Sequence, residues 1–498
     1  MRVLHVITGL DAGGAEQQLR LLLQHLSVRC EVATLTRPGA IAATVRDSGI
    51  PVFDVEMAHN RDLSVLSRLE GLMSRGRYDL VHTHLYRACV YGRMAARLAG
   101  VPHIVATEHS IGDRLIEGRP ISAGVRRLYL STERYTDATI AVSDTVARRL
   151  VGWGVPAERL VVIPNGIDAA EFRYDPALRA FTRARLCLGP RDYLVGAVGR
   201  LEPTKQFDLL VRALRGLDDA TLLLVGEGSQ RAVLEELARA EGVSGRVRFT
   251  GETPNVRAQL CAMDVLAAPS DEETFGLAVL EALACGLPVV YVACPALDEL
   301  PPNAAPGARR TPLDIGWFRT ELAAVRQSAP NRLPPPPAVT RYDIAPLAAQ
   351  VELLYEQVRA GRPPTSPSRP LTRPPTSPSR PLARPAGAVG PASPAGAVGS
   401  ARPAGAVGPA SSASPSSSAS PASSARPVPL SAVSGEESTM ASPAHVLCRC
   451  SLRAPCWSSW SCWAPAPVSC SARASRRPTT RRRTSSSRRW PSPATRPR

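Results

Sequence analysis

Two glutamates eight positions apart, Glu273 and Glu281, have the spacing to act on one ligand. They lie in the stretch SDEETFGLAVLEALACGLPVV, residues 270–290. A helix is predicted there by apolar residues at i, i+4 spacing: Phe275, Val279 and Leu283. If Glu273 stands at the entrance of a continuous helix, Glu281 follows about 12 Å along its axis, and the two carboxylates reach different parts of a long ligand. The alternative is a pair of solvated helix carboxylates.

The loop at 199–205 has the residues to bind an anion. GRLEPTK follows an apolar run, YLVGAV, and places Gly199, Arg200 and Lys205 near the start of the next helix. Lys205 is the only lysine among 60 basic residues, which makes its position informative. Arginine binds phosphate in a bidentate manner and lysine binds it as a point charge, so the loop predicts a diphosphate site. A surface salt bridge is the alternative.

A second glycine-containing turn lies near the N-terminus, in ITGLDAGGAE. Gly13 and Gly14 directly precede a predicted helix that begins near Ala15. Glycines there allow positive φ and a close approach of a ligand, and the N–H groups that open the helix favour an anion. The turn is not the G-x-G-x-x-G fingerprint, so no nicotinamide site is predicted. A plain turn is the alternative.

Histidines stand near the ends of two predicted strands. His82 and His84 lie in DLVHTHLY, and His109 follows Glu108 in ATEHS. In open α/β sheets ligands bind beyond the carboxyl ends of the strands, so His109 is placed to donate a hydrogen bond to a sugar hydroxyl. Each histidine alone is also compatible with a structural, half-buried role.

Short apolar runs alternate with helical patterns through residues 1–360, which predicts an α/β fold with parallel sheets covered on both faces. The pattern restarts near residue 193, after the turn PNGID at 164–168, so two such units are expected. Loops are predicted at 295–310 and 332–339. An amphipathic helix is predicted at 342–358.

Residues 361–498 differ in composition from the rest of the 498-residue chain. They are rich in Pro, Ser, Ala and Arg and contain short repeats, so a disordered tail is predicted. Their 19 Arg and 2 acidic residues account for the whole net charge of +17. Residues 1–360 are therefore neutral overall, and no specific nucleic-acid binding is expected.

The six cysteines of residues 1–360 form no C-x-x-C pair, so neither a zinc site nor a disulfide framework is indicated. Reduced thiols favour a cytoplasmic location. The N-terminal run RVLHVITGL is too short for a secretion signal, and no run of 18 apolar residues predicts a membrane span.

Over roughly residues 1–358 the sequence resembles the retaining glycosyltransferases of family 4, which have the GT-B fold. The resemblance rests on ITGLDAGGAE, PNGID, GRLEPTK, LLLVGEG, VRFTG and the E-x7-E motif of Glu273 and Glu281, in that family's order. It implies two Rossmann-like domains facing across a cleft. The expected parts are an acceptor-side domain at 1–170, a nucleotide-sugar domain at 171–340, a helix at 341–360 that returns to the first domain, and the tail at 361–498.

The resemblance also implies roles for single residues. Arg200 and Lys205 would neutralise the donor diphosphate, and His109 would contact the donor sugar near the reacting carbon. Glu273 would hold that sugar together with the backbone of Phe275, Gly276 and Leu277. Glu281 would accept hydrogen bonds from the ribose, and Gly13 and Gly14 would let their loop approach the phosphates. The catalytic set implied is His109, Glu273, Arg200 and Lys205.

Two features depart from the family pattern. Gln206 follows Lys205 where the family often has glycine. The acidic segment that usually follows the second strand is matched only loosely, by Asp298 and Glu299.

The implied reaction is sugar transfer, with retention of configuration, from a UDP-, GDP- or ADP-sugar to a glycan or lipid-linked acceptor in cell-surface polysaccharide or glycoconjugate synthesis. No metal or cofactor is expected, because the two cations would take the place of Mg²⁺. A cytoplasmic enzyme with peripheral contact at the inner face of the plasma membrane is compatible with such acceptors. The alternatives are a nucleotide-sugar 2-epimerase of the same fold and a noncatalytic carbohydrate- or partner-binding protein.

Overall fold

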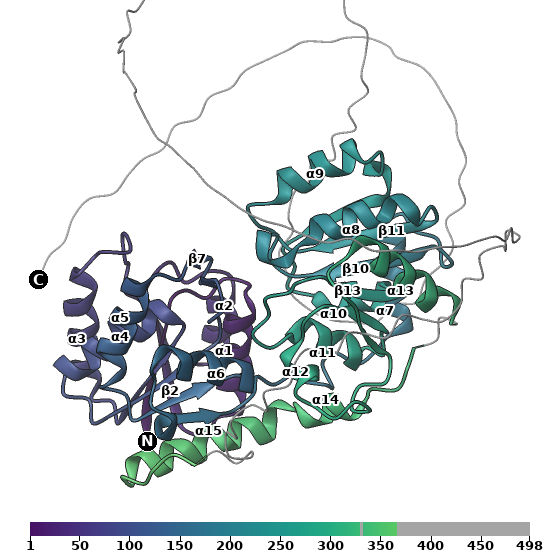
Figure 1. Ribbon diagram of the computed structural model, residues 1–498. Coiled ribbons are helices and arrows are strands. Elements are labelled where there is room, and N and C mark those ends of the chain that lie inside the picture. The colour runs from purple at the N-terminus through teal and green to yellow at the C-terminus, as the bar shows by residue number, and fades with distance from the viewer. Residues whose placement is uncertain (329–331, 366–498) are drawn as a thin grey trace, which may run out of the picture. The chain divides into compact units, whose positions relative to one another are not determined.

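Two parallel sheets dominate the computed structural model, which describes residues 1–328 and 332–365. The first has seven strands in the order β3-β2-β1-β4-β5-β8-β9, and the second has six in the order β12-β11-β10-β13-β14-β15. The expected α/β fold with two Rossmann-like units is confirmed (Figure 1). From residue 366 onward the predicted tail lies outside the described residues.

The inner strands of the first sheet are buried on both faces, including polar positions such as His82 and His84 of β4. Its strands are β1 (Arg2–Ile7), β2 (Arg29–Thr34), β3 (Val52–Asp54), β4 (Leu80–His84), β5 (His103–Glu108), β8 (Ala138–Ala141) and β9 (Leu160–Val162). The helices between them are α1 (Gly14–His25), α2 (Ile41–Asp47), α3 (Ser64–Gly76), α4 (Tyr86–Leu98), α5 (Ala123–Glu133) and α6 (Asp144–Trp153). A small antiparallel hairpin, β6 (Leu115–Ile116) and β7 (Arg119–Pro120), precedes α5.

The second sheet repeats this construction. Its strands are β10 (Tyr193–Val198), β11 (Ala220–Val225), β12 (Val247–Gly251), β13 (Val265–Ala268), β14 (Val289–Tyr291) and β15 (Ala308–Arg310). Its helices are α7 (Pro176–Arg185), α8 (Phe207–Ala213), α9 (Arg231–Ala240), α10 (Val256–Ala262), α11 (Leu277–Ala284), α12 (Pro295–Asp298), α13 (Ile315–Gln327) and α14 (Pro337–Arg341).

The last helix, α15 (Ile344–Arg359), packs against the first sheet rather than the second (Figure 1). Its apolar face joins a core cluster with residues of β1, β4, β5, β8 and β9. The chain crosses over beside the earlier connection, because Ile167 N–H donates to Tyr342 O at 2.8 Å and Ile344 N–H donates to Ile167 O at 3.1 Å. The exact domain boundaries proposed from the sequence stay predictions.

Two segments predicted as loops contain regular structure. Residues 295–310 include α12 and β15, and residues 332–339 include the start of α14. Each element is short, and β15 reads Ala-Arg-Arg, without apolar alternation. Pairing of β15 with β14 stabilises it as a strand, and that long-range contact leaves no local pattern in the sequence.

Among the helices of the described residues, none has both the length and the apolarity that crossing a membrane requires.

Replacing one of two neighbouring leucines of α15 tests how this helix is anchored. Leu354 is 2 % exposed and Leu353 is 50 % exposed. Leu354→Ala leaves a cavity in the core and is expected to lower the free energy of unfolding by about 2–5 kcal/mol. Leu353→Ala removes the same atoms from the surface and serves as the matched control, with an expected change within about 0.5 kcal/mol. Urea unfolding measures both, and equal losses in the two variants would contradict the packing described.

Candidate functional site

The acidic loop, defined here as residues 270–276, connects β13 to α11. Helix α11 begins at Leu277, two residues later than the apolar spacing predicts, so Glu273 precedes the helix and the 12 Å helical spacing to Glu281 does not apply. The helix starts later because Gly276, directly before it, adopts a left-handed backbone conformation with φ +107°. A Cβ at that position would lie 2.4 Å from Cys294 Sγ, so only glycine fits this turn.

Lys205 and Glu273 form an ion pair, in which Lys205 Nζ donates to Glu273 Oε1. Lys205 ends a short 3₁₀ turn, Pro203–Lys205, directly after β10, and Glu273 lies in the acidic loop after β13. The structure therefore brings together two residues that the sequence places 68 positions apart. Their side chains are 28 % and 18 % exposed, so an anion that binds to the ammonium would compete with the carboxylate.

Gln206 shows why glycine is common after this lysine. Its backbone is left-handed, with φ +51° and ψ +37°, a conformation that costs a non-glycine residue about 1–2 kcal/mol. Its side-chain Nε2 donates to Asp271 Oδ1 at 2.6 Å, which offsets part of that cost. The departure from the family pattern thus adds a contact to the acidic loop.

Groups from the first sheet's side hold the same loop. The Arg114 backbone N–H donates to Glu272 Oε1 at 2.7 Å, and its guanidinium lies 3.2 Å from Glu272 and 3.3 Å from Asp271. Ser143 Oγ donates to Thr274 O at 2.8 Å. Arg149 donates to Glu273 O at 3.3 Å. Sequence reasoning missed Arg114, Ser143 and Arg149. Only Ser143 had a usable signature, as a serine just before a helix.

The glycine turn before α1 differs from its prediction. Gly13 has φ −99°, and neither Gly13 nor Gly14 is among the described residues with positive φ. Gly13 needs space, because a Cβ there would lie 2.1 Å from the Glu16 carboxylate. A Cβ on Gly14 would lie 3.5 Å from Leu277 Cδ1, an ordinary contact distance. The turn therefore lies against the start of α11, and its contact with phosphates stays a prediction.

Arg200 is exposed and lies close enough to Glu16 to influence it. Burial raises the pKa of Glu16 to about 7, and the positive charge of Arg200 opposes that rise. Glu16 was not predicted from the sequence. It places a carboxyl group at the start of α1, between the glycine turn and one of the two expected diphosphate-binding cations.

Glu281 is half-buried on α11, and its carboxylate has no hydrogen-bond partner within residues 1–328 and 332–365. Burial raises its pKa to about 7, the negative charge of Glu171 raises it further, and Arg20 opposes both. A ligand hydroxyl that donates to this carboxylate would supply the missing partner.

His109 is 7 % exposed and lines a cavity of about 30 Å³ together with Gln18 and Asn165. Burial lowers its pKa to about 4, an effect that the Asn165 side chain partly offsets. Its Nε2 lies 3.3 Å from His84 Nδ1. His109 is thus a neutral, buried group at neutral pH, and its contact with a sugar remains a prediction.

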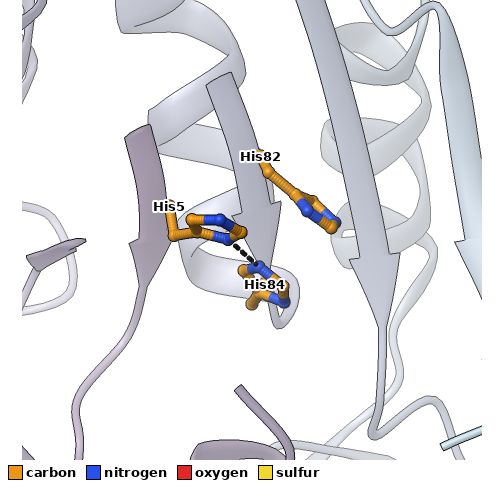
Figure 2. Close-up of side chains that lie close together, drawn as sticks. All are labelled: His5, His82 and His84. Carbon is orange, nitrogen blue, oxygen red and sulfur yellow. Dashed lines mark hydrogen bonds between the residues drawn. The ribbon is translucent and has the colours of Figure 1, made fainter. Parts of the chain in front are cut away.

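Three histidines of the first sheet, His5, His82 and His84, place one ring nitrogen each within 4.8 Å of one another (Figure 2). Proximity alone would suit a metal ion. Both nitrogens of His82 are already used, at 2.6 Å from Tyr355 Oη and 2.7 Å from Thr107 Oγ1, so a metal would have to displace one of these bonds. His82 therefore has a structural role, the alternative that the sequence left open for each histidine. The expectation that the protein binds no metal stays a prediction.

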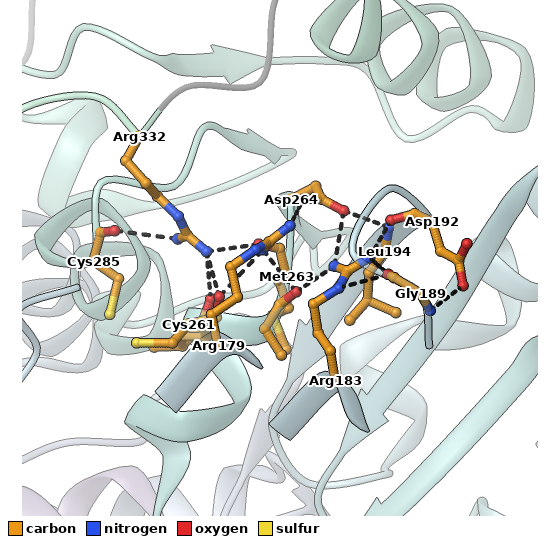
Figure 3. A network of polar contacts seen from close by, with 12 residues as sticks. Arg179, Arg183, Gly189, Asp192, Leu194, Cys261, Met263, Asp264, Cys285 and Arg332 are labelled. Atoms are coloured by element: carbon orange, nitrogen blue, oxygen red, sulfur yellow. Dashed lines mark hydrogen bonds and ion pairs between the residues drawn. The ribbon is translucent and has the colours of Figure 1, made fainter. Parts of the chain in front are cut away.

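Another dense polar network, around α10, is structural (Figure 3). Arg179 and Arg183 pair with Asp264 at 2.6 and 3.3 Å, and Arg332 donates to the carbonyls of Cys261 and Met263 at 2.6 and 2.7 Å. These guanidinium groups satisfy backbone carbonyls at the C-terminal end of α10, which would otherwise lack donors.

Asp298 and Glu299 are likewise engaged. Glu299 accepts from the backbone N–H groups of Asp144 and Thr145 at 3.0 and 2.8 Å, at the start of α6. Asp298 accepts from Cys294 N–H at 3.0 Å. Both carboxylates therefore stabilise the fold in the described arrangement.

Comparison with known proteins gives a consistent result. A model described as Glycosyltransferase Family 4 matches residues 12–171, and one described as Glycosyl transferases group 1 matches residues 192–312. The D-inositol 3-phosphate glycosyltransferase of Salinispora tropica is 34% identical over 283 residues, which cover 51% of this chain and 58% of that enzyme. The enzyme of the same name from Mycobacterium sp. (strain KMS) is 34% identical over 345 residues, covering 62% and 77%.

Solved structures share the fold. HepE of Anabaena, in complex with UDP and glucose, superposes with a TM-score of 0.64 at 23% identity, covering 72% of this chain and 99% of that chain. Sucrose-phosphate synthase from Thermosynechococcus elongatus superposes with a TM-score of 0.60 at 20% identity, covering 72% and 100%. Both likenesses establish the GT-B architecture of two parallel-sheet units.

The pKa of Glu281 predicts a pH effect on stability. Because burial raises this pKa from 4.5 to about 7, ionising the carboxyl costs more in the folded than in the unfolded chain. The cost is absent below pH 4.5 and grows as the pH rises to about 7. Glu281→Gln removes it, so the variant is expected to gain stability relative to the wild type between pH 5 and pH 8. Thermal unfolding at both pH values measures the difference.

Glu158→Gln, which removes an exposed carboxylate far from α11 in the sequence, controls for the loss of one negative charge. A stability difference between Glu281→Gln and the wild type that does not change with pH would contradict the burial of this carboxyl.

Proposed function

Because the chain belongs to the family 4 glycosyltransferases, which are transferases of the GT-B fold, we propose that it moves a sugar from a nucleotide-diphosphate sugar to a glycan or lipid-linked acceptor with retention of configuration. The observation that carries the proposal is the Lys205–Glu273 pair on the acidic loop, with the Gly14 turn lying against Leu277 beside it. At the acidic loop, a cation that could bind a diphosphate thus lies next to a carboxylate that could bind a sugar.

The donor is proposed to be a UDP-, GDP- or ADP-sugar. HepE has been crystallised with UDP and with UDP-glucose, which supports a nucleotide-sugar donor in this fold. In this chain Lys205 would bind the diphosphate, Arg200 would add a second positive charge, and the first N–H groups of α11 would lie close by.

Charge development explains what these groups would do. Breaking the bond between sugar and diphosphate leaves negative charge on the leaving group, and preorganised donors at such a charge are worth ~3–4 kcal/mol each. Glu273, once its ammonium partner binds the diphosphate, would accept from hydroxyls of the sugar. Glu281, a half-buried carboxylate without a hydrogen-bond partner among the described residues, would accept from the ribose.

The acceptor is proposed to be uncharged at the reacting end. The curated relatives are named for D-inositol 3-phosphate, which carries a phosphate. In this chain three arginines on the first sheet's side already have carboxylate partners: Arg87 with Glu117 at 3.4 Å, Arg114 with Glu272 at 3.2 Å and Arg149 with Asp113 at 2.8 Å. An acceptor phosphate would have to displace one of these carboxylates, as the donor diphosphate would displace Glu273 from Lys205, whereas a glycan without a phosphate requires no such second exchange, which favours a neutral glycan. A lipid-linked glycan would bring the enzyme to the inner face of the plasma membrane, so a cytoplasmic location with peripheral contact is part of the proposal.

Incubation with a nucleotide sugar, with and without an acceptor, separates two other functions from this one. A 2-epimerase of the same fold would convert the donor without an acceptor, and a noncatalytic binding protein would release no nucleoside diphosphate. A thermal-shift screen with UDP-, GDP- and ADP-sugars selects the donor, and release of nucleoside diphosphate is then followed with neutral glycans and with D-inositol 3-phosphate.

Substituting either proposed donor-binding residue is expected to abolish most transfer. Lys205→Ala removes the diphosphate cation and Glu281→Ala removes the proposed ribose acceptor, so each should lower kcat/KM at least about 100-fold, since each loses a charged hydrogen bond of about 3 kcal/mol. Release of nucleoside diphosphate measures turnover, and circular dichroism checks the fold.

Arg191→Ala, which removes an exposed cation from the loop before β10, is the matched control and should keep wild-type turnover. Near-normal turnover of Lys205→Ala or Glu281→Ala would remove that residue from the site.

A further inference from the structure

Three histidines form a hydrogen-bonded line across the first sheet to a cavity that is lined in part by α1 and α15. His5 Nδ1 lies 3.1 Å from His84 Nε2, and His84 Nδ1 lies 3.3 Å from His109 Nε2 (Figure 2 shows the first contact). They come from β1, from β4 and from the turn directly after β5. The sheet register pairs Ile7 with His84 and His84 with Thr107, so the three adjacent strand ends bring the rings to one face.

Burial keeps all three rings neutral. It lowers the pKa of His5 to about 3, that of His109 to about 4 and that of His84 well below its usual value. A neutral imidazole has one N–H donor and one bare nitrogen acceptor. His84 uses one nitrogen for each neighbour, so it donates to one and accepts from the other. The two hydrogen bonds therefore run in the same direction, either from His5 toward His109 or the reverse.

The two ends of the line decide the direction. His5 is fully buried, and its Nε2 has no hydrogen-bond partner within the described parts of the chain. If the line ran toward His5, that nitrogen would carry an N–H without an acceptor, the rarer and more costly kind of orphan group. If it runs toward His109, His5 keeps only a bare nitrogen in the core.

At the other end, His109 Nδ1 also has no hydrogen-bond partner within the described parts of the chain, but its ring lines a cavity in which a water molecule can accept. With the line running toward His109, the N–H of that ring is on Nδ1. His109 and Asn165 line the same cavity of about 30 Å³, which is large enough for a water molecule. The Asn165 side chain lies close enough to raise the pKa of the ring, but no hydrogen bond joins it to Nδ1 in the described structure.

We propose that His5 and His84 are positioning residues, which direct the N–H of His109 to Nδ1 and so make His109 a fixed hydrogen-bond donor toward the cavity. As a consequence, Nδ1 of His109 cannot take a proton from an acceptor hydroxyl, and its role is to donate to an oxygen atom within the cavity. This consequence for catalysis rests on the proposed function; the position of the proton does not.

His82 is the internal comparison. It lies beside His5 and His84, but its two nitrogens bond to Tyr355 and Thr107, so it is outside the line. A substitution at His82 perturbs the same core without breaking the link from His5 to His109.

The test is the proton position itself, read by long-range ¹H–¹⁵N NMR of the full chain with ¹⁵N-labelled histidine. The chain has eight histidines, few enough to assign with single variants. The expected result is an Nδ1–H tautomer for His5, His84 and His109 in the wild type. An Nε2–H tautomer at His109 overturns the proposal, as does one zinc ion per purified chain held by His5 and His84.

Variants then test the link. His5→Phe keeps a ring in the core but removes the donor to His84, so an Nε2–H signal is expected to appear at His109. His82→Phe should leave the His109 tautomer as in the wild type. An unchanged His109 tautomer in folded His5→Phe overturns the proposal, and if that variant does not fold, the wild-type tautomer decides alone.

Activity gives a separate readout. If the proposed transfer occurs, His5→Phe should lower kcat about tenfold, the equivalent of one hydrogen bond, with little change in KM for the donor. Absence of any transfer activity in the wild type would count against the proposed function and would leave the NMR result unaffected.

Discussion

The acidic loop at residues 270–276 is held by positive and polar groups from both sheets, and the candidate site depends on that constraint. Lys205 and Gln206 bind it from the second sheet, while Arg114, Ser143 and Arg149 bind it from the side of the first. Several of these contacts are partly exposed, and exposed ion pairs contribute only about 0–1 kcal/mol each. Their combined effect is to fix the position of one short loop. Such contacts add little to the stability of the fold, so a role in shaping a binding site explains them better.

The same loop explains how charge is balanced around the proposed donor. The Lys205 ammonium and the Glu273 carboxylate neutralise each other, so a diphosphate that takes the lysine releases the glutamate for hydrogen bonds with a sugar. Gly14 lies against Leu277 at the start of α11, which places the first glycine turn beside this pair. The line from His5 to His109 connects the core of the first sheet with a cavity that is lined in part by α1 and α15.

The sequence identifies the loops around the candidate site better than the contacts between them, and the binding roles of the site residues stay predictions. The single lysine and Glu273 lead to an ion pair in the loops after β10 and β13, and the glycine turn lies against Leu277 at the start of α11. Glu281 lies within α11, and no hydrogen bond or ion pair joins it to Lys205 or Glu273 in the described residues. The start of α11 was wrong by two residues, because the reason lies in a contact of Gly276 with Cys294, which no local pattern encodes. Arg114 and Arg149 were missed because they act across more than 100 residues, and β15 because pairing with β14 rather than its own composition makes it a strand.

The most direct measurement is a crystal structure of the full chain with the nucleotide sugar that a binding screen selects. The expected result is a diphosphate oxygen within hydrogen-bonding distance of Lys205 Nζ, with Arg200 turned toward the same group and Glu273 bonded to sugar hydroxyls. A bound nucleotide sugar that lies elsewhere, with Lys205 still paired to Glu273, would contradict the assignment of this loop as the donor site.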